Sequence, residues 1–145
     1  MKTKVLLFVA SMILSATAIR AEKAVAGPAG GRLLDTEPAR AEFVVNAARK
    51  GEIRFYDAAL KPLAPVQQVV TVTAEPAAGR VKLEVEKTEF GFVTKEAMPA
   101  GDPYRVVVQV RATPEAKPQN FRLDLALGNC GGCQRAEYAC TCESH

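Results

Sequence analysis

Apolar and polar residues alternate along most of this chain, and this period of two constrains the fold more than any other feature. In the clearest stretch Val81, Leu83 and Val85 alternate with charged residues. Since successive side chains of a strand point to opposite faces, each such stretch predicts a strand with one buried face. The predicted strands are 40–47, 52–57, 67–74, 80–86, a shorter one beginning at Phe90, 104–111 and 121–127, with 32–35 as a candidate eighth.

Short strands that are apolar on one face need a second layer to cover that face. We therefore predict an all-β fold, an immunoglobulin-like β-sandwich of seven to eight antiparallel strands, with a small closed barrel as the alternative. Prolines in 99–103 and 113–118 end strands, because proline cannot donate a ladder hydrogen bond. Only residues 37–50 allow a helical interpretation, and Phe43-Val44-Val45 favours a strand there.

The first eighteen residues have the pattern of a secretory signal peptide. Lys2 and Lys4 precede an apolar run, 5–14, which is followed by small residues before a cleavage site. The run is shorter than the roughly 20 residues that a bilayer span requires. We expect cleavage after Ala18, or alternatively after Ala21, a periplasmic or secreted location, and no stable membrane insertion afterwards.

The expected organisation after residues 1–18 is a flexible leader at 22–31, a β-sandwich domain at 32–128 and a Cys-rich tail at 129–145. Removing the signal peptide takes away two lysines and no acid, so the net charge falls from +3 to +1. A charge so near zero gives no reason to expect nucleic acid as a partner. About fifteen inward apolar side chains, at roughly 1.5–3 kcal/mol each, offset chain entropy without cross-links.

The predicted sandwich has no recognisable catalytic grouping. The only histidine is His145, and Ser144 is the only serine beyond the signal peptide, so a Ser-His-Asp arrangement has no residues within the domain. Met98 is the only methionine beyond the signal peptide, which excludes a methionine-rich copper site. We therefore predict a protein that is not an enzyme.

All four cysteines and the histidine lie in the last sixteen residues, with the spacing Cys-x2-Cys-x6-Cys-x-Cys-x2-His. Thiolate and imidazole are ligands that zinc and copper(I) prefer. Gly131 and Gly132 allow the backbone to turn tightly around an ion, and Arg135 and main-chain amides would offset the charge of the thiolates. The predicted metal ligands are Cys130, Cys133, Cys140, Cys142 and His145.

Two other interpretations of the same cysteines stay open. An exported chain with an even number of cysteines is normally oxidised, so two disulfides could close loops of about ten residues in the tail. The protein would then be a non-catalytic interaction or structural sandwich that holds no ion. The third interpretation, thiol–disulfide exchange, lacks the strand–helix context that activates a Cys-x-x-Cys pair.

Two parts of the chain carry a resemblance to a known family. The first part comprises residues 30–34, 41–45 and 53–57 together with Lys61-Pro62. The second part is Cys130-x2-Cys133 with the following residues 136–142. Both parts resemble a periplasmic β-sandwich domain that occurs alone and at the start of adaptor (membrane fusion) subunits of heavy-metal efflux pumps. The resemblance implies a role in handling copper, zinc or a related metal, with the four cysteines as ligands and an efflux component as partner. The chain lacks the hairpin and lipoyl-like parts of the adaptors, which implies a stand-alone accessory protein.

Overall fold

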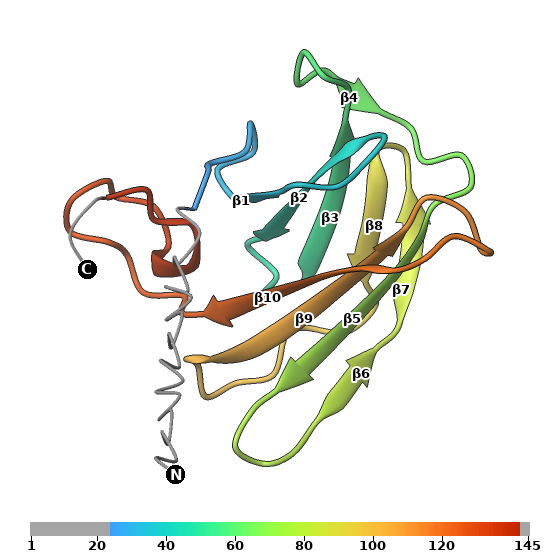
Figure 1. Ribbon diagram of the computed structural model, residues 1–145. Coiled ribbons are helices and arrows are strands. Elements are labelled where there is room, and N and C mark those ends of the chain that lie inside the picture. Colours follow the sequence, from blue (N-terminus) through green and yellow to red (C-terminus); the bar gives the residue numbers. More distant parts are fainter. Residues whose placement is uncertain (1–23, 143–145) are drawn as a thin grey trace, which may run out of the picture.

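The computed structural model describes residues 24–142, which form two antiparallel sheets packed face to face (Figure 1). The strands in this range are β1 (Arg32–Leu34), β2 (Arg40–Val45), β3 (Gly51–Tyr56), β4 (Pro62–Leu63), β5 (Val69–Glu75), β6 (Val81–Leu83), β7 (Val85–Thr88), β8 (Gly91–Thr94), β9 (Tyr104–Arg111) and β10 (Gln119–Leu125). The predicted signal peptide with its cleavage positions, and the predicted ligand His145, lie outside the described residues.

The first sheet, sheet A, has the strand order β1-β2-β3-β8-β7, and β4 pairs with the end of β3. The second, sheet B, has the order β10-β9-β5-β6. The prediction of an all-β sandwich of antiparallel strands is confirmed. The described residues hold ten strands rather than seven or eight. The two-residue strand β4 was not predicted, and the predicted strand 80–86 is divided in two.

That divided strand crosses from one sheet to the other. β6 pairs with β5 in sheet B, whereas β7 pairs with β8 in sheet A, and Glu84 alone separates them. Leu83 is buried, but Val81, which was expected to face inward, is 40% exposed. Alternation continues through the crossing, so the pattern of the sequence contains no sign of the change of sheet.

The core lies between the sheets and consists of the inward faces of their strands. Phe43, Ile53 and Phe55 of sheet A are at most 1% exposed. Sheet B contributes alternate residues of its central strands, as the period of two predicts. These residues are Val70, Val72 and Ala74 of β5, Tyr104, Val106, Val108 and Val110 of β9, and Leu123 and Leu125 of β10.

We expected residues 22–31 to be a flexible leader. From residue 24 onward the segment instead forms a turn that is hydrogen-bonded to a buried carboxylate. Glu42 on β2 is 0% exposed. Its carboxylate accepts hydrogen bonds from the backbone N–H of Ala29 at 3.1 Å and of Gly31 at 2.7 Å, and from the hydroxyl of Tyr56 at 2.7 Å. Burial and the bond to Glu42 raise the pKa of Tyr56 to about 12. A buried carboxylate is thus matched by three donors.

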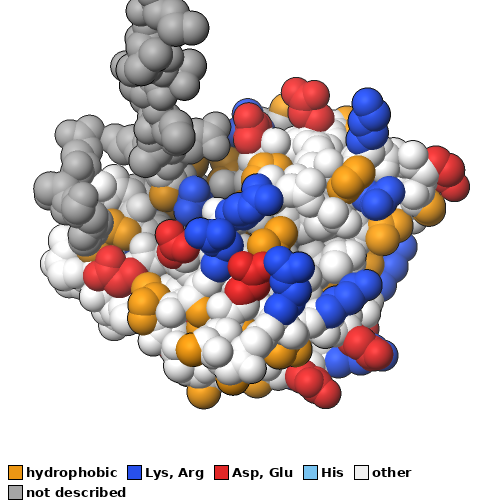
Figure 2. Space-filling model, turned by 60° about the horizontal axis from the view of Figure 1, so that its bottom comes forward, with side chains coloured by type: hydrophobic (Ala, Val, Ile, Leu, Met, Phe, Trp, Pro, Cys, Tyr) orange, Lys and Arg blue, Asp and Glu red, His pale blue; other side chains and the backbone are white. Residues whose placement is uncertain are grey.

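The surface carries interspersed basic and acidic side chains, as the face in Figure 2 shows. Arg105 on β9 lies opposite Asp124 on β10, and Arg80 forms an ion pair with Glu75. Within residues 24–142, no helix has the length and apolar character that crossing a bilayer would require.

Candidate metal centre

The cysteine-rich segment follows β10 after a short connection and folds into a closed loop. The backbone N–H of Cys130 donates to the carbonyl of Arg135 at 2.7 Å, and the N–H of Gln134 donates to the carbonyl of Cys130 at 2.9 Å. Gln134 has a φ of 58°, in the left-handed region that reverses the chain. This reversal brings Arg135 back beside Cys130 at the start of the loop.

A short 3-10 helix, η1 (Glu137–Ala139), then fixes the segment to the sandwich. The N–H groups of Glu137 and Tyr138 donate to the carbonyls of Gly128 at 2.8 Å and Ala126 at 3.2 Å. Tyr138 and Ala139 are buried in the same core as the strands. The Tyr138 ring meets Phe43 edge-on, with the ring centroids 5.7 Å apart. The Cys-rich tail is therefore anchored to the sandwich in its middle as well as at its start.

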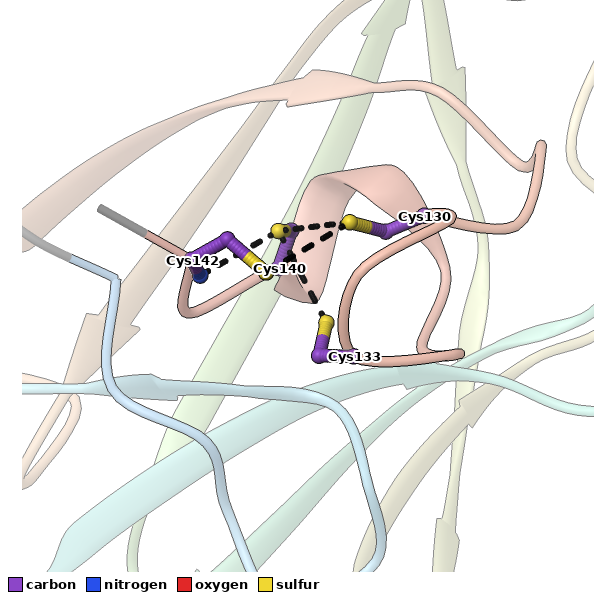
Figure 3. Close-up of side chains that lie close together, drawn as sticks. All are labelled: Cys130, Cys133, Cys140 and Cys142. Carbon is purple, nitrogen blue, oxygen red and sulfur yellow. Dashed lines mark hydrogen bonds between the residues drawn. The ribbon is translucent and has the colours of Figure 1, made fainter. Parts of the chain in front are cut away.

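The loop and η1 bring all four cysteine side chains together, pointing toward one another (Figure 3). Their Sγ atoms all lie within 4.8 Å of one another. The Sγ of Cys140 is 3.1 Å from that of Cys130 and 3.7 Å from that of Cys133, and the Sγ atoms of Cys130 and Cys142 are 3.8 Å apart. Four sulfur atoms at such separations could hold one metal ion between them.

Hydrogen bonds give the thiols different acidities. Bonds from the backbone N–H groups of Arg135 and Thr141 lower the pKa of the Cys133 thiol. The hydrogen bond with Cys130, by contrast, raises the pKa of Cys140 to about 12. The backbone N–H of Cys142 also donates to the Sγ of Cys140, at 3.4 Å. Such amide donors stabilise thiolates, so these backbone groups would offset part of the charge of ionised sulfurs.

Gly132 forms one wall of the cluster. A Cβ atom added there would lie 2.8 Å from the Sγ of Cys142 and 3.9 Å from that of Cys130. At the neighbouring Gly131 an added Cβ would meet nothing within 4 Å. A side chain at position 132 would therefore push the Cys142 sulfur from its place in the cluster, whereas position 131 has no such steric constraint.

Four of the five predicted ligands are thus brought together, namely Cys130, Cys133, Cys140 and Cys142. The alternative with two disulfides is not what this structure contains, because no two of these four cysteines lie at disulfide-bonding distance. The 3.1 Å between the Sγ atoms of Cys130 and Cys140 exceeds the roughly 2.05 Å of a disulfide bond.

Tyr138 is the residue of this region whose importance sequence reasoning missed. Its hydroxyl accepts a hydrogen bond from the backbone N–H of Val45 at 2.9 Å, so it links the tail to β2. One signal was present in the sequence, since an aromatic residue inside a run of ligands has an apolar surface that needs burial.

A scan against protein-family models, a search of curated proteins and a search of solved structures each find no match for this chain.

Proposed function

We propose that this protein binds one soft metal ion, zinc or copper(I), through Cys130, Cys133, Cys140 and Cys142. The observation that carries the proposal is the convergence of four Sγ atoms within 4.8 Å of one another. Thiols gathered so closely crowd negative charge when they ionise, and a bound cation compensates that charge. Cys130 is buried and the other three are half-buried, so the site combines a sheltered interior with access for an ion.

The sulfur separations favour zinc as the first ion to test. Tetrahedral coordination with Zn–S bonds of about 2.3 Å places neighbouring sulfurs about 3.8 Å apart. Two of the separations, 3.7 Å and 3.8 Å, match this value, and the 3.1 Å between Cys130 and Cys140 needs a small outward movement. Copper(I) is the second ion, because it shares the preference for thiolate ligands.

We further propose that the protein acts outside the cytoplasm and is an accessory to heavy-metal handling or efflux, without catalysis. Support for export is the signal-peptide pattern of residues 1–18, and support for the efflux role is the resemblance of the 30–62 and 130–142 stretches to adaptor domains. Amino-terminal sequencing of the exported protein is expected to begin at Ile19.

The metal proposal is tested by native mass spectrometry of protein purified from the exported fraction without chelator. The expected mass exceeds that of the apo chain by one metal ion and is reduced by the protons that the thiols lose on binding. Added zinc is expected to bind with a stoichiometry of one to the wild type and not to a variant with all four cysteines replaced by serine. A wild-type protein with free thiols that takes up neither zinc nor copper(I) would contradict the proposal.

The second candidate function is a structural or interaction sandwich whose tail is closed by disulfides. The observation that favours it is the 3.1 Å separation of the Cys130 and Cys140 sulfurs, which requires little movement to form a bond. The same mass measurement decides between the two. Metal-free protein four hydrogens lighter than the reduced chain would establish this alternative.

A further inference from the structure

The four thiols of the cluster are not held equally by the rest of the fold. This difference bears on how an ion would leave the site, and the inference drawn from it rests on the proposed metal binding. An all-thiolate site keeps its ion unless another strong donor replaces its sulfurs one after another. The first ligand to be replaced would be the one whose displacement disturbs the fold least.

Cys130 is held most firmly. Its side chain is 2% exposed. Its backbone N–H and carbonyl are both bonded within the closed loop, to Arg135 and Gln134. Moving its sulfur out of the cluster would therefore open the loop and expose a buried side chain.

Cys133 and Cys140 are held less deeply but by identifiable bonds. Backbone N–H groups of Arg135 and Thr141 bond the sulfur of Cys133. Cys140 follows η1 directly, and its N–H donates to the carbonyl of Glu137 at 3.1 Å. Both residues thus belong to segments that the loop or the core fixes in place.

Cys142 is held least. It lies three residues beyond Ala139, the last residue of the core cluster, and it is half-buried. Within the described part of the chain, the backbone hydrogen bond of Cys142 goes to the sulfur of Cys140, at 3.4 Å, and not to the sandwich (Figure 3). Rotating Cys142 away would break a contact inside the cluster and leave the core packing intact.

Within residues 24–142, backbone and no side chain covers the Cys142 sulfur on the side of Gly132. Gly132, the residue whose added Cβ would lie 2.8 Å from this sulfur, is exposed and has no side chain to cover it. The preceding Gly131 is exposed as well, with open space where a side chain would be. An approaching sulfur atom therefore meets bare backbone on this side of the cluster.

We infer that Cys142 is the exchangeable ligand through which the bound ion passes directly to a protein that presents a pair of thiols. A soft ion binds oxygen and amine donors more weakly than thiolate, so these donors would not displace Cys142. The acceptor is therefore a protein with thiol ligands. In the first step the acceptor's sulfur binds the ion and its thiol proton passes to solvent. The metal–Sγ bond of Cys142 breaks, and the released thiolate takes up a proton, so no electrons are transferred.

The test follows the transfer of zinc from the loaded protein to a short peptide containing one Cys-x-x-Cys pair. For the wild type, the transfer rate is expected to rise in proportion to peptide concentration, and native mass spectrometry is expected to detect a protein–zinc–peptide complex. Cys142→Ser already lacks the ligand that must leave, so its transfer is expected to be roughly tenfold faster than that of Cys133→Ser. Cys133→Ser is the matched control, because it also removes one half-buried thiol.

Two results would overturn the inference while leaving the metal site itself intact. One is a wild-type transfer rate that does not depend on peptide concentration, because the ion would then leave by simple dissociation. The other is equal transfer rates for the two serine variants. A wild-type protein that binds no zinc in the loading step would instead remove the proposed function, and this inference with it.

Discussion

The hydroxyl of Tyr138 accepts a hydrogen bond from the backbone N–H of Val45, 93 residues earlier in the chain, at 2.9 Å. Tyr138 lies two residues before Cys140, so a single side chain connects the cysteine cluster to sheet A. The cysteine-rich segment and the sandwich therefore pack as one unit, and an ion bound to the cysteines would stabilise the whole fold.

Removing this hydroxyl tests the connection. Tyr138→Phe leaves the Val45 N–H without its partner, so the free energy of unfolding is expected to fall by about 1–2 kcal/mol. Zinc affinity is expected to fall with it, because η1 is then held less firmly. Urea unfolding with and without zinc measures both effects. Tyr104→Phe is the control, since the Tyr104 hydroxyl donates to the carbonyl of Pro99 rather than to the tail. It is expected to lower stability without weakening zinc binding.

Gly132 and its neighbour form a pair for testing the packing of the cluster. Gly132→Ala places a methyl group 2.8 Å from the Cys142 sulfur, so at least a tenfold loss of zinc affinity is expected, about 1.4 kcal/mol. Gly131→Ala adds the same methyl group where nothing lies within 4 Å, and is expected to leave the affinity unchanged. Competition with a zinc indicator measures both. Equal affinities for the two variants would show that the sulfurs are not packed against residue 132.

Asp102 predicts a pH dependence of stability in the acid range. The hydrogen bond from the N–H of Leu127, with further help from Arg49, lowers the pKa of Asp102. Because the folded protein favours the ionised form, the stabilisation is fully present above the unfolded pKa of about 3.9 and is lost as the pH falls through the lower folded value. Urea unfolding of Asp102→Asn between pH 7 and pH 2.5 is expected to show a shallower acid loss than the wild type. Parallel curves would exclude Asp102 as a source of that loss.

The buried carboxylate of Glu42 helps to hold the turn that contains Ala29 and Gly31. Glu42→Gln replaces one acceptor oxygen by a donor facing the N–H groups of Ala29 and Gly31, so a loss of about 2–3 kcal/mol in unfolding free energy is expected. Hydrogen exchange of those two amides is expected to accelerate more than that of β9. Glu86→Gln, at an exposed position, serves as the control and is expected to change neither quantity.

The sheet faces were predictable from the sequence because burial follows directly from alternation. Val70, Val72 and Ala74 are buried as the period of two requires, and the four cysteines meet as their clustering in the chain suggests. Alternation reports which face of a strand is buried, but not which sheet the strand joins. The alternation therefore could not predict the crossing at Glu84 or the exposure of Val81.

The contacts that hold the Cys-rich tail and residues 24–31 against the sandwich were not predicted, for a different reason. Tyr138 and Glu42 act through partners that lie far away in the chain, at Val45 for the first and at Ala29 and Gly31 for the second. Local composition carries no information about such pairings. Gly-rich and Cys-rich segments look unstructured when only their neighbours in sequence are considered, and become ordered when a buried partner uses their backbone donors.

The strand that changes sheets at Glu84 also determines where this sandwich can open. β6 and β7 are the edge strands on one long side, and the covalent chain itself joins them there. On the opposite side lie the other two edges, β1 and β10, and here the sheets are connected through side chains and through η1, which bonds β2 and packs on β10. We therefore expect separation of the sheets to begin at the edge beside the cysteines, because the Glu84 side is joined by the chain itself. An ion bound by Cys130 and Cys140 would connect the segment after β10 to the residue that follows η1, and would thereby strengthen the edge that the chain does not join directly.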